Sequence, residues 1–177
     1  ARYLSRIKAG LEKKDIYAPF FLITSGGGLT TLETARKFPI RLVESGPAGG
    51  AILASKLSSQ LGSNASLSFD MGGTTAKLCL INAGEPRLSR QFEVDRSYRF
   101  KKGSGLPLKI PVIEMLEIGA GGGSIAHLDK MDRIKVGPES AGSSPGPACY
   151  NLGGNEPPVP HADLFQGKMV VENFPFD

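Results

Sequence analysis

Residues 67–78 read LSFDMGGTTAKL, and this stretch decides the fold. Leu67 and Phe69 alternate with polar residues, which is the period of a half-buried β-strand. Apolar residues resume from Leu78, where a return strand is expected. The pattern therefore predicts a strand, a glycine turn and a second strand.

The turn of this predicted hairpin has the composition of a phosphate site. Gly72 and Gly73 carry no side chain, so a phosphate can approach their amide N–H groups closely. Thr74 and Thr75 add hydroxyl donors, and Asp70 is suited to orienting water around Mg²⁺, which prefers oxygen ligands. An ordinary hairpin with a Gly-Gly turn is the alternative. The acid before the glycines and the hydroxyls after them favour the phosphate site.

The bulk composition is that of an ordinary soluble globular protein. The chain has 177 residues, 40% of them hydrophobic and 21% charged, and a formal net charge of +4. No basic stripe interleaved with aromatic residues indicates nucleic-acid binding. Two cysteines are too few for a disulfide framework, and neither a membrane-spanning run nor a signal peptide is visible, so a reducing cytoplasm is expected. The two ends of the chain look cut, which suggests an internal fragment.

Strands and helices alternate in the first half of the chain, which predicts an α/β fold. The triple glycine at residues 26–28 stands between a strand and a helix, where it either offers amides to an anion or acts as a hinge. The Gly/Pro/Ser-rich residues 137–160 are expected to form a binding loop or a lid. The basic residues Arg99, Lys101 and Lys102 are expected in a solvated turn. Helices are expected at residues 2–13, 30–37, 48–61 and 162–169, and strands at 20–23, 40–43, 85–97 (as a pair), 111–117, 125–129 and 133–136.

Four motifs in order resemble the hydantoinase A/oxoprolinase family. They read ESGPAGG at residues 44–50, FDMGGTT at 69–75, EIGAGGGSIA at 117–126 and GPACY at 146–150. The resemblance covers nearly the whole chain. It implies an ATP-dependent N-methylhydantoinase, a 5-oxoprolinase or the nucleotide-binding subunit of an acetone-type carboxylase. It also implies a ribonuclease H-like fold, as in actin, sugar kinases and heat-shock chaperone ATPases.

The resemblance further implies a role for each motif. The turn with Asp70, Gly72, Gly73 and Thr74 would be the second phosphate-binding turn for ATP and Mg²⁺. A second glycine wall of the cleft would consist of Gly121, Gly122, Gly123 and Ser124. Such families usually carry another Gly-Gly-Thr hairpin further upstream. The chain would then hold about half of the ATP site, and weak or undetectable ATPase activity is expected for it alone.

The sequence departs from the family pattern at two positions. Lys77 stands where many members have an aspartate; it either contacts phosphate directly or marks a subgroup with different chemistry. His161 stands where many members have the aspartate of a Thr-Asp-Ala motif. Cys149, His161 and Asp163 are residue types that bind zinc or build a thiol nucleophile, but their spacing matches no standard metal motif. Ordinary loop and surface residues are the alternative for this set, and equally for His127 and Asp129.

The function that these observations favour is ATP-dependent hydrolysis of a cyclic amide of the hydantoin or 5-oxoproline type. Asp70 and Lys77 are the candidate catalytic residues. A carboxylase subunit acting on a ketone, a small-molecule kinase and a non-catalytic, actin-like ATP-sensing domain are the alternatives. The expected protein partner is a hydantoinase B-like subunit or domain, with no nucleic acid and no membrane. The expected organisation is an α/β segment over residues 1–63, a strand-rich core over 64–136 and a Gly/Pro-rich end over 137–177.

Overall fold

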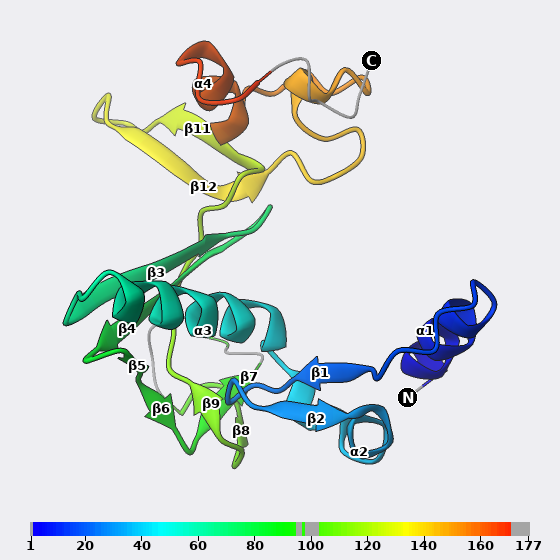
Figure 1. The fold of residues 1–177 in the computed structure, drawn as a ribbon. Coiled ribbons are helices and arrows are strands. Elements are labelled where there is room, and N and C mark those ends of the chain that lie inside the picture. Colours follow the sequence, from blue (N-terminus) through cyan, green and yellow to red (C-terminus); the bar gives the residue numbers. More distant parts are fainter. Residues whose placement is uncertain (1, 95–96, 98–102, 171–177) are drawn as a thin grey trace. The chain divides into compact units, whose positions relative to one another are not determined.

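The computed structural model describes residues 2–94, 97 and 103–170, and within them it confirms the α/β class (Figure 1). The helices are α1 (Arg2–Glu12), α2 (Leu32–Lys37), α3 (Ser45–Gln60) and α4 (Val159–Phe165), with short 3-10 helices η1 (Pro39–Leu42) and η2 (Ala148–Tyr150). The strands are β1 (Phe21–Ile23), β2 (Leu29–Thr31), β3 (Ala65–Met71), β4 (Ala76–Asn82), β5 (Glu85–Pro86), β6 (Leu88–Ser89), β7 (Phe92–Val94), β8 (Leu106–Leu108), β9 (Val112–Ile113), β10 (Leu116–Ile118), β11 (Ser124–Leu128) and β12 (Ile134–Ser140).

The chain forms two compact units. The first comprises residues 1–68 and 79–115, and the second comprises residues 69–78 and 116–177. The limits that the sequence analysis proposed at residues 63 and 136 remain a prediction, and the compact units divide at other positions. The tip of the β3–β4 hairpin belongs to the second unit, together with the second glycine stretch.

Helix α3 forms the main core of the first unit with strands β4 and β9. Ala48 and Ala51 on the helix are fully buried against Ile81, with Cys79 and Ile113 completing the cluster. The small side chains of Ala48 and Ala51 therefore allow close packing of the helix against the strands. Burial also raises the pKa of the Cys79 thiol, so this cysteine is a small apolar core residue rather than a nucleophile.

Strands β1 and β2 pair as a hairpin around the triple glycine. Gly27 has a φ of +82° and the Thr24 amide donates to the Gly28 carbonyl, so the glycines close a turn between two strands. The geometry of strand, glycine loop and helix, which would offer amides to an anion, is absent from this segment. Helix α2 follows β2 directly because the Thr31 side chain caps it, accepting from the Thr34 amide.

Three strand predictions needed correction. Residues 40–43 do not form a strand, because Pro39 favours a helical start and the Arg41 and Val43 carbonyls instead accept from Ser25. The described residues of the segment 85–97 do not pair with one another: β5 pairs with β4, β6 with β9 and β7 with β8. The segment from residue 111 to 117 divides into β9 and the start of β10.

The second unit has few apolar residues in its interior. Strands β11 and β12 form the predicted hairpin, and an isolated bridge from Ile125 to Pro158 ties the start of α4 to it. Helix α4 begins three residues before its predicted start. The buried positions are mostly glycine, serine and proline: Gly121, Gly123, Ser124, Gly137, Gly146, Pro147 and Pro158. Close contact between backbone segments therefore replaces a large apolar core in this unit.

No helix within the described residues has the length and apolar character needed to span a membrane. The predicted basic turn with Arg99, Lys101 and Lys102 lies outside the described residues, as does the C-terminal segment from residue 171.

Candidate functional site

The tip of the β3–β4 hairpin is the centre of the candidate site, and it is a tight turn. The Gly72 amide donates to the Thr75 carbonyl at 2.9 Å, which closes the turn between the two strands. This amide is therefore engaged within the hairpin, so the assignment of the Gly72 N–H to a phosphate must be corrected. Gly72 instead contributes a backbone that allows the turn.

The Gly73 and Thr74 amides of the tip remain exposed, and the Thr75 amide lies against Gly121. Among the described residues, those of Gly73, Thr74 and Thr75 donate no hydrogen bond. Gly73 and Thr74 are exposed, and a Cβ at Gly73 would meet no atom within 4 Å. Asp70 is also exposed at the end of β3. Consecutive amides beside hydroxyls and a carboxylate are the donors and ligands that a phosphate group with a bound cation needs.

The second glycine stretch lies directly against this hairpin. The Gly122 amide donates to the Gly72 carbonyl at 2.8 Å, and the Gly123 amide donates to the Gly73 carbonyl at 2.7 Å. The Gly121 amide donates to Ser124 Oγ at 2.9 Å. The Ser124 amide donates to the Gly121 carbonyl at 3.0 Å. All four amides of the proposed wall are therefore used within the protein, so they position the hairpin tip and offer no amide donor to a nucleotide.

Glycine is required in this stretch because two backbones touch. A Cβ on Gly121 would lie 2.6 Å from the Gly72 oxygen and 2.6 Å from the Thr75 nitrogen. A Cβ on Gly123 would lie 3.0 Å from the Gly73 oxygen. Sequence reasoning missed this partnership between the two glycine stretches. The sequence shows that each glycine stretch follows a strand, but only the structure shows that β4 pairs with β10 and brings the two stretches together.

Ser124 holds the second glycine stretch in shape and is fully buried. Replacing Ser124 with alanine leaves the Gly121 N–H without its acceptor. We expect this to lower the free energy of unfolding by about 1–3 kcal/mol, measured by urea unfolding of the 177-residue chain. Ser143→Ala, at an exposed position, is the control and should stay within about 0.5 kcal/mol of the native chain. Equal stability of the two variants would contradict this role of Ser124.

Lys77 lies on β4 opposite Glu117 of β10. Side chains at such paired positions are close enough to interact across the strands, and these two carry opposite charges. A role of Lys77 toward phosphate remains a prediction, and any such role would operate beside a carboxylate.

The structure does not assemble Cys149, His161 and Asp163 into a ligand set. No three His, Cys, Asp or Glu side chains among the described residues are placed to hold a metal ion. Asp163 lies 3.9 Å from the Lys168 ammonium group, and burial raises the pKa of the Cys149 thiol, which disfavours a thiolate nucleophile. His161 follows Pro160, which lies near Gly122, and its Nδ1 atom is buried with no hydrogen-bond partner among the described residues.

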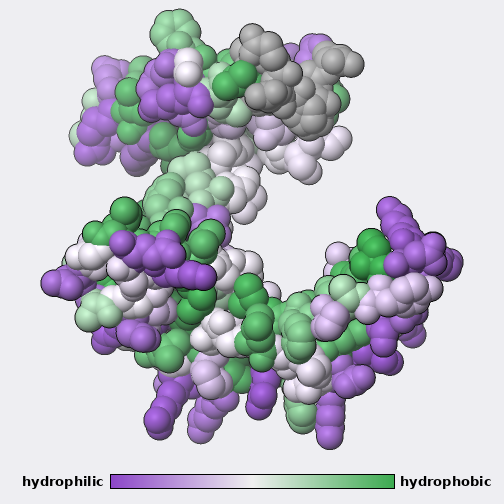
Figure 2. Space-filling view, viewed as in Figure 1, coloured by the Kyte–Doolittle hydropathy of each residue, from purple (hydrophilic) through white to green (hydrophobic). Residues whose placement is uncertain are grey.

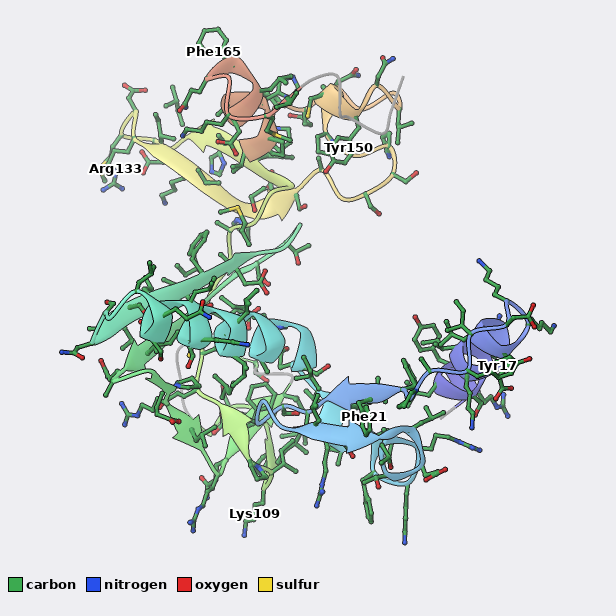
Figure 3. All side chains as sticks on the ribbon, in the orientation of Figure 1. Tyr17, Phe21, Lys109, Arg133, Tyr150 and Phe165 are labelled. Atoms are coloured by element: carbon green, nitrogen blue, oxygen red, sulfur yellow. The ribbon has the colours of Figure 1, made fainter. Side chains whose placement is uncertain are left out.

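Asp129 organises the β11–β12 hairpin rather than a metal site. Its carboxylate accepts from the Arg133 side chain and from the Met131 amide, and Figure 3 labels Arg133 at this end of the hairpin. The Arg133 hydrogen bond is the main cause that lowers the Asp129 pKa below its ordinary value. A lowered pKa stabilises the fold above the unfolded-state pKa, and this contribution is lost as the pH falls through the folded-state value.

We therefore expect the β11–β12 hairpin to loosen progressively below about pH 4. Hydrogen exchange of the Met131 and Arg133 amides, followed from pH 5 downward after correction for the intrinsic rate, measures this. Asp129→Asn should show faster exchange at pH 5 and little further pH dependence. A native hairpin whose protection is unchanged through this range would contradict the assignment.

Comparison with known proteins places the chain in a family. The family model described as hydantoinase/oxoprolinase matches residues 1–176. The chain belongs to the hydantoinase/oxoprolinase family. This confirms the resemblance that the four sequence motifs indicated.

The family members most useful for comparison are enzymes of much greater length. The caprolactamase α subunit of Pseudomonas jessenii is 36% identical over 169 residues, covering 96% of this chain and 23% of the subunit. The 5-oxoprolinase of Saccharomyces cerevisiae is 35% identical over 176 residues, covering 98% of this chain and 12% of that protein. The nucleotide-free structure of an acetone carboxylase, from a study of ATP-dependent acetone carboxylation, has a TM-score of 0.71 and 28% identity, over 94% of this chain and 22% of that one. The chain thus spans a quarter or less of these relatives.

Proposed function

We propose that this chain carries one side of the nucleotide site in an ATP-dependent enzyme that opens a cyclic amide. The observation that carries the proposal is the β3–β4 hairpin tip, where the amides of Gly73, Thr74 and Thr75 have no partner among the described residues. Relatives named caprolactamase and 5-oxoprolinase support a cyclic amide as the substrate class.

The residues of the tip fit a phosphate chain with a magnesium ion. Mg²⁺ prefers oxygen ligands and keeps several waters, and Asp70, Thr74 and Thr75 offer oxygens that are exposed or half-buried. ATP supplies the phosphoryl group that turns an amide or carboxylate oxygen into a group that is easily displaced. This chain's residues would bind phosphate oxygens through the exposed amides of Gly73 and Thr74 and orient water through Asp70. Positioning and charge stabilisation are the main protein contributions to phosphoryl transfer.

The remaining expectations are part of the same proposal. The fold would be the ribonuclease H-like type, with the other phosphate hairpin supplied by sequence beyond this chain. The protein partner would be a hydantoinase B-like subunit or domain, which agrees with the subunit names of the relatives. The site of action would be the cytoplasm.

The first experiment uses the 177-residue chain alone. Titration calorimetry with MgATP should give weak binding, and phosphate release should stay at the background rate, because only one side of the nucleotide site is present. Tight binding of MgATP accompanied by turnover would refute the proposal that this chain carries only one side of the nucleotide site.

The second experiment uses the whole enzyme with its partner subunit. Phosphate release is measured with a panel of 5-oxoproline, caprolactam and hydantoin. Release that depends on one of these cyclic amides supports the proposal. A phosphorylated product would indicate a kinase, and binding without substrate-dependent turnover would indicate an ATP-sensing domain.

The similarity to an acetone carboxylase supports a second candidate, a carboxylase subunit. That structure resembles this chain with a TM-score of 0.71 and 28% identity, and the crystal structure of the caprolactamase from Pseudomonas jessenii resembles it with a TM-score of 0.65 and 34% identity. Phosphate release that requires a ketone together with bicarbonate would select this candidate. Release with a cyclic amide alone would select the hydrolase.

A further inference from the structure

The first compact unit contains an interruption between two short strand ladders. In the β6–β9 ladder, Ser89 lies opposite Val112. In the β7–β8 ladder, Phe92 lies opposite Leu108. Two residues therefore separate the ladders on one side and three on the other. Such a bulge bends the strands and re-aims the side chains beside it, and bulges often occur next to functional sites.

An open depression of about 440 Å³ lies at this interruption. Its lining residues come from both sides of the bulge: Arg90, Gln91, Lys109 and Pro111. Figure 3 labels Lys109, and Figure 2 shows hydrophilic side chains projecting along the lower edge of this unit, below β6 and β8. The depression combines two cationic side chains and an amide with the apolar proline ring.

The charges in the depression are not neutralised by the described part of the protein. Neither Arg90 nor Lys109 makes an ion pair or a side-chain hydrogen bond among the described residues. Arg87, three residues before Arg90, is different, because its Nε lies 2.8 Å from the Glu114 carboxylate. No acidic residue is among the four that line the depression. Like charges gathered in one concavity create a positive potential that attracts an anion.

The chemistry of the lining residues indicates which anion fits. The Arg90 guanidinium offers a planar fork of N–H donors that matches a carboxylate or phosphate in a bidentate manner. The Lys109 ammonium adds a point charge, and the Gln91 side chain adds amide donors. The aliphatic stems of Arg90 and Lys109, with the ring of Pro111, give apolar walls for the rest of a small molecule.

We propose that this depression is a binding site for a small dianion, either a phosphate group or a dicarboxylate. It is formed entirely by the first compact unit, whereas the hairpin tip belongs to the second. The proposed anion site therefore does not depend on the proposed ATP site, and an experiment that rejects one of them does not reject the other.

The test titrates the 177-residue chain separately with inorganic phosphate and with succinate at low ionic strength. Chemical-shift changes of the Gln91 side-chain amide and of the Arg90 and Lys109 backbone amides are followed by NMR. Saturable shifts at these residues with millimolar or tighter affinity support the site. The anion that binds more tightly identifies the source as a phosphate or a carboxylate. Absence of saturable shifts with both anions would overturn the proposal.

A matched pair of variants separates a built site from net charge. Arg90→Gln combined with Lys109→Gln should weaken binding of the preferred anion by about tenfold or more. The control combines Lys14→Gln with Lys56→Gln. Both are exposed lysines of the same unit, so the control also removes two positive charges. The control should bind within about twofold of the native chain, because neither lysine is among the residues that line the depression. An equal loss of anion affinity in the two double variants would overturn the proposal. The single variant Lys109→Gln repeats the test if the double variant does not fold.

Discussion

Gly121→Ala is expected to lower the free energy of unfolding of the chain by about 1–3 kcal/mol, which is the usual cost of overpacking. The new Cβ would lie 2.6 Å from the Gly72 oxygen and the Thr75 nitrogen and 2.7 Å from the Thr74 carbonyl carbon. These are backbone atoms, so no rotation of a side chain relieves the overlap. The hairpin tip must move as a whole, and its three free amides move with it. Urea unfolding measures the stability, and MgATP titration of the whole enzyme measures the effect on the site.

The adjacent glycine provides the control for this substitution. A Cβ on Gly122 would lie 3.7 Å from the Gly72 oxygen, which is an ordinary van der Waals distance. Gly122→Ala should therefore change the stability by less than about 1 kcal/mol and leave nucleotide affinity close to the native value. Equal effects of the two alanine variants would show that the second glycine stretch does not position the hairpin tip.

Asp70→Asn is expected to lower kcat/KM for ATP in the whole enzyme by about 100-fold or more, if the carboxylate orients magnesium-bound water. The asparagine keeps the shape of the side chain and removes its charge. Asp70 is exposed and makes no ion pair among the described residues, so the fold should be unaffected. The concentration of Mg²⁺ needed for half-maximal activity should also rise, which a purely structural role would not produce.

Asp132→Asn is the control for the charge change. Asp132 is also an exposed aspartate of the second unit, and it lies in the β11–β12 turn with a φ of +58°, a conformation that asparagine tolerates. This variant should retain native activity and magnesium dependence. Native activity of Asp70→Asn, with an unchanged magnesium requirement, would remove Asp70 from the proposed site.

The two glycine stretches explain why the hairpin tip is well defined although its own unit has few buried apolar residues. The amides of Gly122 and Gly123 donate to the carbonyls of Gly72 and Gly73. The Ser124 hydroxyl accepts from the Gly121 amide and so holds the second glycine stretch in its conformation. The free amides that follow in the turn are therefore held by a backbone ladder. In the proposed nucleotide site, this ladder would hold the tip in place before the ligand binds, which would reduce the entropy cost of binding.

Several features were determined by the sequence alone, because they depend on local order along the chain. The alternation around Leu67 and Phe69 predicted the strand β3, although the structure exposes both of these side chains. The apolar return predicted β4, and the glycines between the two strands predicted the turn. Helix α3 and the β11–β12 hairpin were predicted from local patterns in the same way. The motifs indicated the family, and the family model over residues 1–176 confirms it.

Tertiary structure alone decided which backbone groups face outward. Gly72 and Gly73 are equally bare in the sequence, yet the Gly72 amide closes the turn and the Gly73 amide donates to no group among the described residues. The strand predicted at residues 40–43 was lost because Ser25, far away in the sequence, binds the carbonyls of that segment. A glycine in the sequence indicates that the backbone at that position approaches another group closely. Whether that neighbour is a ligand or another backbone depends on hydrogen bonds between distant segments, which residue order does not specify.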